Sequence, residues 1–506
     1  MPPPRARRIV LIMTDTQRTD MLGCYGNRDM HTPNLDRLAA QGLRFDRAYT
    51  CQPVCGPARA ALFTGLFPHS NGGWTNSVAL AANVKTVGQR LHDQGVRCAY
   101  IGKWHLDGGD YFGVGRCPDG WDPAYWYDMR CYLNELSPED RLRSRDRRIN
   151  KDPNLTAEFT FGHRCSNRAV RFLEEHGAGE FLLCVSYDEP HDPYVCPRPF
   201  SEMYRDYDFP KPANVWDTLA DKPAHQRVWA EKANIGDPDL YRIHAPDLFG
   251  CNSFIDHEIG RVLEAVDRHA PDALVLYTSD HGDLLGSHRL TGKGPVLYDE
   301  ITRIPLIVRW PGVTPAGALC AHPVSHIAVT PTILDAMGLP PAQWCDGRTV
   351  LPTLADPSRR PAEAVFMEFT RYEIDHDGFG GFQPLRGVFD GRYKLTINLL
   401  TSDELYDMQE DPCEMRNLIA SPAHAQVRDA LHDRIIDWMN DTRDPFRGYC
   451  WERRPWRADA RPASWDHTAM TRQREHEEYE PRQLDYATGL AMETATRTKF
   501  PAARRK

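Results

Sequence analysis

Four short apolar segments, each followed by polar residues, constrain the fold more than any other feature of the sequence. They cover residues 9–13, 97–101, 181–186 and 273–278. Amphipathic segments lie between them, and strands that alternate with helices are typical of a parallel sheet covered by helices. A length of 506 residues with 41% hydrophobic residues allows a large core. The sequence therefore predicts an α/β fold, with a large mixed, mostly parallel sheet between helices.

Helix signals fall between these segments. We expect a helix after Thr32 as its cap, with Pro33 in its first turn and Gly42 as its stop. Further helices are expected at 87–94, from Ser166 to about residue 176, and at 255–269.

The pattern changes after about residue 365. Short apolar runs at 365–369, 385–389 and 393–398 are separated by turn residues, and an amphipathic stretch at 426–439 follows. These features predict a small antiparallel sheet and a helix. We therefore expect a catalytic α/β domain at 1–364, a small C-terminal α+β subdomain at 365–443 and an extended tail at 444–506.

Composition excludes several classes of protein. The net charge of -9 and the sequence pI of about 6.1 argue against nucleic-acid binding, which needs a basic face. No apolar run reaches the length of a membrane helix, and the five apolar residues at 9–13 are too few for a signal peptide. The 14 cysteines are scattered, as in proteins that keep their thiols reduced. We expect a cytoplasmic protein without a membrane partner, and the aromatic, basic tail is compatible with a homo-oligomer.

Polar side chains follow each of the four predicted strands. They are Asp15 after the first, Lys103 and His105 after the second, Asp188 and His191 after the third, and Asp280 and His281 after the fourth. Ligands of open α/β sheets bind at the carboxyl ends of strands, so these groups should converge. Asp15, Asp280 and His281 suit a hard or borderline divalent cation, with Ca²⁺ as the first choice and Mn²⁺ or Mg²⁺ as alternatives.

The segment Cys55-Gly-Pro-Ala-Arg59, followed by Thr64-Gly65, precedes and enters a predicted helix. Free N–H groups at a helix start favour an anion, and Arg59 lies one turn along the same face. From the residues alone, Cys55 is either a thiolate of low pKa or a small capping or core residue.

This segment resembles the signature of the type I sulfatases, a family of the alkaline phosphatase superfamily. The resemblance extends over essentially the whole chain and includes Gly-Lys103-Trp-His105, Pro190-His191, Ser279-Asp280-His281-Gly282 and Lys293. The chain looks most similar to cytoplasmic bacterial sulfatases, and Asn76 is similar to a residue of phosphonate monoester hydrolases. The resemblance implies an alkaline phosphatase-like fold and hydrolysis of a small-molecule sulfate ester, such as an aryl sulfate.

The resemblance also implies roles for individual residues. A formylglycine-generating enzyme would convert Cys55 to formylglycine, whose hydrated form attacks sulfur, and the metal would be held by Asp15, Cys55, Asp280 and His281. Arg59, Lys103 and Lys293 would neutralise the sulfate. His191 would assist the leaving group and His105 would deprotonate the diol, although these two roles are interchangeable. We further expect Asn76, Arg371 and the glycine-rich stretch 377–382 near the substrate.

One departure from the family pattern lies after the first strand. The family usually has two aspartates there, whereas this chain has Asp15-Thr16-Gln17. Thr16 or Gln17 could supply the second ligand, or the site could have one ligand fewer. The alternatives are a phosphonate monoester or phosphodiester hydrolase on the same scaffold, a non-catalytic binding protein, and a hydrolase that uses the Cys55 thiol itself.

Overall fold

The main body is built on a mixed sheet. The computed structural model describes residues 4–108, 111–339, 344–373, 381–457 and 459–461. Within them, eight strands follow the order β3-β4-β1-β5-β6-β2-β7, with β8 paired to β2. The strands are β1 (Arg8–Thr14), β2 (Leu43–Tyr49), β3 (Arg97–Gly102), β4 (Phe181–Ser186), β5 (Leu274–Ser279), β6 (Arg303–Arg309), β7 (Ala318–Cys320) and β8 (Val324–Ser325). β3, β4, β1 and β5 are parallel and β6 is antiparallel to both neighbours, so the predicted fold class is confirmed.

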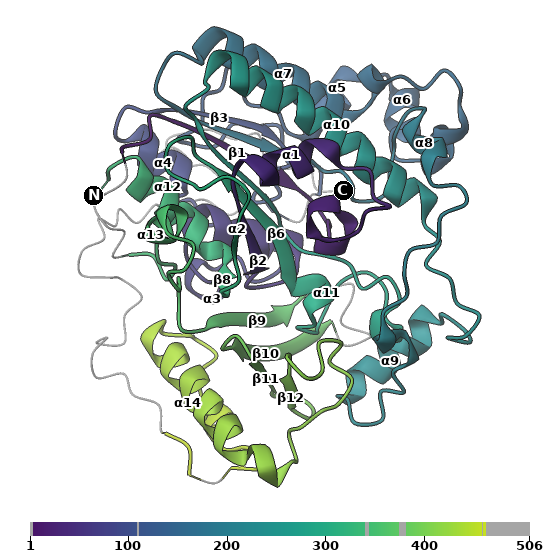
Figure 1. Cartoon of the computed structure of the whole chain (residues 1–506), viewed down its shortest axis with the longest axis vertical. Helices are drawn as coiled ribbons and strands as arrows, with labels where there is room; N and C mark the ends of the chain where they lie inside the picture. The colour runs from purple at the N-terminus through teal and green to yellow at the C-terminus, as the bar shows by residue number, and fades with distance from the viewer. Residues whose placement is uncertain (1–3, 109–110, 340–343, 374–380, 458, 462–506) are drawn as a thin grey trace, which may run out of the picture.

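Helices cover both faces of this sheet (Figure 1). Ile9, Leu11 and Met13 of β1 share one core with side chains of α2 (Cys55–Thr64), α4 (Val87–His92), α12 (Val329–Ala336) and α13 (Leu351–Ala355). Val10 and Ile12 share the opposite core with α1 (Pro33–Gln41), α7 (Phe161–His176) and α10 (Pro246–His269). Because both faces are buried, the strands read as continuous apolar runs in the sequence.

A second, smaller sheet is antiparallel, with the order β12-β11-β10-β9. It consists of β9 (Val365–Arg371), β10 (Phe382–Phe389), β11 (Tyr393–Asn398) and β12 (Glu404–Asp407), and α14 (Ala425–Asp441) packs on one of its faces. Its other face meets Tyr49, Val54 and Leu297 of the main body. The small sheet and its helix, which lie at the bottom of Figure 1, were both predicted.

Two predicted helix starts were wrong, and the start after Thr32 was right. The helix expected from Ser166 begins at Phe161, because Thr160 caps it by accepting a hydrogen bond from the His163 N–H, and Ser166 is buried inside it. The helix expected after Thr32 begins at Pro33 and stops at Gly42, as predicted, although the Thr32 hydroxyl oxygen accepts from the Gly23 N–H and makes no side-chain capping bond to this helix. The helix expected at 255 begins at Pro246.

The remaining helices are short connections. They are α3 (Pro68–Asn71), α5 (Met129–Glu135), α6 (Pro138–Arg143), α8 (Phe200–Met203), α9 (Ala224–Ala233), α11 (Asp299–Thr302) and α15 (Tyr449–Glu452). None of the helices in the described ranges combines the length and the apolar character that a membrane crossing requires. The tail expected at 444–506 lies outside these ranges beyond residue 461.

Candidate active site

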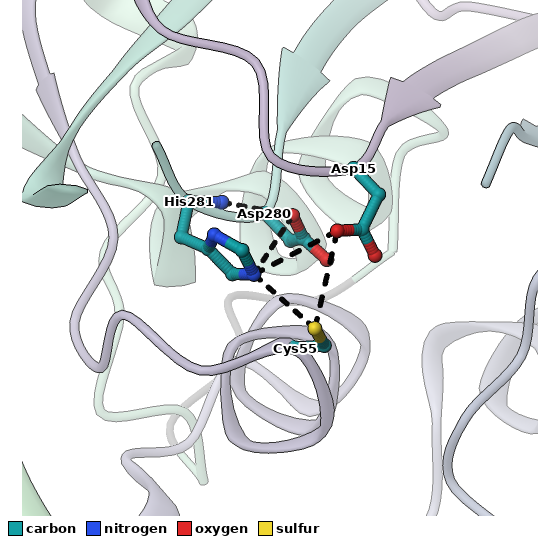
Figure 2. A group of neighbouring side chains, drawn as sticks. All are labelled: Asp15, Cys55, Asp280 and His281. Carbon is teal, nitrogen blue, oxygen red and sulfur yellow. Dashed lines mark hydrogen bonds and ion pairs between the residues drawn. The ribbon is translucent and has the colours of Figure 1, made fainter. Parts of the chain in front are cut away.

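Four side chains from three elements meet at the carboxyl edge of the large sheet (Figure 2). Asp15 follows β1, Asp280 and His281 follow β5, and Cys55 is the first residue of α2. One donor atom from each lies within 4.8 Å of all the others, and all four residues are buried. The parallel course of β1 and β5 produces this convergence, because the ends of parallel strands share one edge.

The residues around Cys55 favour the start of a helix at this position. Val54 before it is extended, Pro57 lies in the first turn, and Gly65 ends the helix with a φ of 68°. The Gly56 N–H donates to Asn76 Oδ1 at 2.8 Å, which places Asn76, predicted near the substrate, beside the start of α2.

Arg59 and Lys103 form a buried layer of positive charge under this cluster. Arg59 Nε lies 3.0 Å from Asp280 Oδ2, and its Nη2 lies 3.2 Å from Asp15 Oδ2. Lys103 Nζ lies 2.8 Å from Asp15 Oδ2 and 2.9 Å from Asp188 Oδ1. Burying either cation alone would be costly, so the carboxylates and cations hold one another in place.

The turn that carries Lys103 depends on Gly102. A Cβ at Gly102, whose φ is +122°, would lie 1.8 Å from the Ser186 carbonyl oxygen. Only glycine allows β3 to approach β4 so closely at this point. The glycine before Lys103 in the sequence motif therefore has a backbone role.

Lys293 and His191 lie on the open side of the cluster. Lys293 Nζ is 2.9 Å from Cys55 Sγ and 3.4 Å from His191 Nε2. His191 Nδ1 lies 3.0 Å from Asp192 Oδ1 and 3.2 Å from the Tyr111 hydroxyl. Burial, Lys103 and Lys293 lower the pKa of His191, but Asp15 and Asp192 outweigh them and raise it to about 10.

His105 is the opposite case. It is buried and adopts a left-handed φ of 57°. Burial lowers its pKa below the ordinary value of histidine, so this imidazole is neutral. His191 and His105, which both follow predicted strands, therefore differ in charge.

The acidic cluster itself fits a divalent cation. Burial raises the pKa of Asp15, but Lys103 and the other cations keep it well below its usual range, so this carboxyl is charged. Burial and the charge of Asp15 raise the pKa of Asp280 to about 6. His281 Nδ1 lies 2.8 Å from the Gly282 carbonyl oxygen; donation of the Nδ1 proton there leaves Nε2 as an acceptor that faces the cluster. Two carboxylates and an oriented imidazole are suitable ligands.

The structure decides between Thr16 and Gln17. The Gln17 amide donates to Asn252 Oδ1 at 2.6 Å and its carbonyl oxygen accepts from the Tyr277 hydroxyl, so this side chain lies away from the cluster. The Thr16 hydroxyl lies 2.7 Å from Asp15 Oδ1. The proposed reach of Gln17 into the site was therefore wrong, and Thr16 occupies the place next to the ligands.

A cavity of about 460 Å³ opens beside Lys293, His191 and Thr16. Its wall includes Tyr372. The residue before it, Arg371, which was predicted to lie near the substrate, pairs with Phe382 where β9 and β10 lie side by side. Of the glycine-rich stretch expected here at 377–382, residues 377–380 lie outside the described residues. Sequence reasoning missed the aromatic lining Tyr194, Trp229 and Tyr241, because no motif marks these segments.

Sequence reasoning placed Asp188 at a strand end but gave it no role of its own. Asp188 accepts hydrogen bonds from Lys103 and from the Tyr111 hydroxyl, and Tyr111 in turn contacts His191. The position of Asp188 directly after a predicted strand was a usable signal for this contact.

Comparisons with known proteins agree with this geometry. Residues 7–339 match the family described as Sulfatase, and residues 286–441 match the family described as N-sulphoglucosamine sulphohydrolase, C-terminal. The chain is 45% identical over 493 residues to the uncharacterized sulfatase YidJ of Escherichia coli (strain K12), covering 95% of this chain and 96% of that protein.

Solved structures share the fold. One is BT4656, which was solved in complex with its substrate D-glucosamine-2-N,6-O-disulfate. Its TM-score is 0.72 at 22% identity, and the match covers 88% of this chain and 100% of the BT4656 chain. The phosphonate monoester hydrolase of Agrobacterium radiobacter has a TM-score of 0.70 at 24% identity, covering 86% of this chain and 96% of its own. The chain belongs to the sulfatase family within the alkaline phosphatase superfamily and is a sulfatase.

Proposed function

We propose that the chain hydrolyses sulfuric esters with a formylglycine made from Cys55. The observation that carries this proposal is the position of Cys55 Sγ, at a helix start, 2.9 Å from Lys293 Nζ and within the cluster of Asp15, Asp280 and His281. A cysteine that only fills space in the core would not be surrounded by a lysine, two aspartates and a histidine. The Cys-x-Pro-x-Arg segment is the signal that a maturing enzyme reads in related sulfatases.

The modified residue would supply the reactive hydroxyl, and Asp15, Asp280 and His281 would hold a cation beside it. Hydrated formylglycine offers one hydroxyl for attack on sulfur and a second whose deprotonation expels sulfate. A divalent cation, when bound, lowers the pKa of a hydroxyl and offsets negative charge on the sulfate. Asp15, Asp280 and His281 would hold that cation together with the modified Cys55, and we favour Ca²⁺ because two of the ligands are carboxylates.

The remaining residues bind the sulfate and move protons. Arg59, Lys103 and Lys293 surround the reacting position and stabilise negative charge that develops on the sulfate oxygens. His191 faces the cavity and stays protonated, so it donates a proton to the leaving alcohol. Buried, neutral His105 accepts the proton of the diol. The difference in pKa between the two histidines supports this assignment over the exchanged one.

A second candidate activity is hydrolysis of phosphonate monoesters and phosphodiesters. The observation that favours it is Thr16, which stands beside Asp15 where related sulfatases carry a second carboxylate. The site consequently has one negative charge fewer. Sulfate monoesters, phosphodiesters and phosphonate monoesters each carry a single negative charge, so we expect side activity on both phosphorus compounds.

The test uses protein of known modification state. Peptide mass spectrometry assigns Cys55 as thiol or aldehyde, and a panel of sulfate, phosphate, phosphonate and diester substrates is then measured. We expect the aldehyde form to cleave sulfate esters fastest and the Cys55→Ala variant to be inactive yet folded. Full activity with an intact thiol would contradict the proposal. Asp280→Asn should lose bound metal and activity together, whereas Asp272→Asn, at an exposed ion pair with Arg8, should keep both.

A further inference from the structure

We propose that the unmodified chain, with Cys55 still a thiol, is a zinc-binding protein at the cluster of Asp15, Cys55, Asp280 and His281. Conversion of Cys55 to formylglycine then changes the preferred cation from a soft or borderline one to a hard one. The second half of this inference rests on the proposed function, but the first half concerns the chain before maturation and stands on its geometry alone.

The distances between the donor atoms suit a tetrahedral ion. Cys55 Sγ lies 3.2 Å from His281 Nε2 and 3.9 Å from Asp15 Oδ1. His281 Nε2 lies 3.7 Å from Asp15 Oδ1 and 3.6 Å from Asp280 Oδ1. Ligands about 2.0–2.3 Å from a tetrahedral zinc ion are about 3.3–3.8 Å apart, so these four separations lie close to the edge lengths of such a tetrahedron, and the remaining pairs lie within 4.8 Å.

The donor types also match zinc. One sulfur, one imidazole nitrogen and two carboxylate oxygens are its usual protein ligands, whereas Ca²⁺ takes six to eight oxygens and Mg²⁺ about six. Thiolate is the soft donor that favours zinc over the hard cations. Gly282 fixes His281 in the tautomer that presents Nε2, so the imidazole is already oriented.

The surroundings tolerate the added charge. Two carboxylates and a thiolate bring three negative charges to the cluster, and Arg59, Lys103 and Lys293 stand against them. Binding of Zn²⁺ replaces the contact between Lys293 Nζ and the sulfur, and a neutral thiol releases its proton to solvent as the S–Zn bond forms. Once the sulfur is replaced by oxygen, the donor atoms are one nitrogen and several oxygens. Because no soft donor remains, the site no longer favours zinc over hard cations.

The test compares three forms of the full chain, each with its modification state fixed by mass spectrometry. They are the thiol form made without a maturing enzyme, the matured form, and the unmodified Cys55→Ser variant. Cobalt(II) is the spectroscopic probe, because a cobalt–thiolate bond gives a near-ultraviolet charge-transfer band that oxygen and nitrogen donors do not give. Zn²⁺ and Ca²⁺ affinities are measured by competition against a chelator.

We expect the charge-transfer band only in the thiol form. Zn²⁺ affinity should fall at least about 100-fold in Cys55→Ser. Loss of a residue that only hydrogen-bonds to a metal ligand already lowers metal affinity about 10–100-fold, and Cys55 is a ligand itself. Ca²⁺ affinity should change by less than about tenfold. The matched control is Cys51→Ser, which alters a buried thiol outside the cluster and should keep the band.

Two results would overturn the inference: a thiol form without the band, or equal zinc affinity in the thiol form and Cys55→Ser. Circular dichroism of each variant separates loss of the site from loss of the fold. Sulfate ester hydrolysis by the matured form is decided independently, so failure of the zinc site and failure of the proposed function give different results.

Discussion

The Nζ of Lys293 lies 2.9 Å from the Sγ of Cys55, although 238 positions separate the two residues. Burial lowers the pKa of Lys293, but the charges of Cys55, Tyr372 and Asp15 together outweigh burial, and the pKa lies well above its ordinary value. Lys293 is therefore a cation beside Cys55. It lines the cavity, whereas Arg59 and Lys103 are fully buried.

Replacement of Lys293 by alanine should slow the reaction rather than unfold the protein. We expect kcat/KM for a sulfate ester to fall by about 10²–10³-fold, the usual effect of removing one group that stabilises charge in the transition state. The matched control is Lys85→Ala, which removes an exposed lysine paired with Asp93 outside the cluster and should leave kcat/KM essentially unchanged. Steady-state kinetics at matched metal content measure both, and equal effects of the two variants would contradict the role of Lys293.

The raised pKa of His191 predicts the basic limb of the pH profile. Its pKa is about 10, above the ordinary 6.5, so the protonated form persists at neutral pH and is lost only as the pH rises through about 10. Hydrolysis of an alkyl sulfate, whose poor leaving group needs a proton, should decline in that range. His191→Asn should remove this limb and slow alkyl sulfates more than aryl sulfates. A variant that slows both equally would show that His191 does not protonate the leaving group.

Thr16→Asp should strengthen metal binding and change the reaction scope. Thr16 has a φ of 63°, a conformation that aspartate tolerates better than a β-branched residue, so the variant should fold. The new charge should weaken the reaction of a doubly charged phosphate monoester most, with kcat/KM ratios to a sulfate monoester shifting about tenfold for each ~1.4 kcal/mol. Thr16→Asn is the neutral control. Equal changes for both substrates would assign specificity to cavity shape instead.

Glu189 should make stability depend on pH. Burial and the neighbouring charge of Asp188 raise its pKa from 4.5 to about 7, and its Oε2 has no hydrogen-bond partner within the described part of the chain. The folded state prefers the protonated carboxyl. Protonated Glu189 therefore adds to the free energy of unfolding in full below about pH 4.5, and this stabilisation is lost as the pH rises through about 7. With about 1.4 kcal/mol per pKa unit, the loss is at most about 3.5 kcal/mol.

Glu189→Gln should remove that loss, because the amide is neutral at every pH. Thermal unfolding from pH 5 to pH 8 should show the variant gaining stability relative to the wild type as the pH rises. Glu363→Gln, at a side chain that is 78% exposed, is the control and should run parallel to the wild type. Parallel curves for Glu189→Gln as well would show that this carboxyl is charged throughout.

Much of the fold followed from the sequence because its signals are local. The apolar runs that became β1, β3, β4 and β5 are buried on both faces, so composition alone marks them. The four-residue strand β12 was not predicted as a strand, because so short a run carries little periodicity. Helix starts at Phe161 and Pro246 were placed too late, since buried polar residues such as Ser166 imitate caps.

The sequence by itself determined which chemical groups the site contains, because parallel strands deliver whatever follows them to one edge of the sheet. Asp15, Lys103, Asp280 and His281 could be named for that reason. Only the tertiary structure decided which of two neighbouring side chains faces the cluster: Gln17 contacts Asn252 and Tyr277, whereas Thr16 contacts Asp15. It also decided that Trp229 lines the cavity. A side chain's direction at a turn, and the meeting of distant loops, depend on packing against residues far along the chain, which no local pattern encodes.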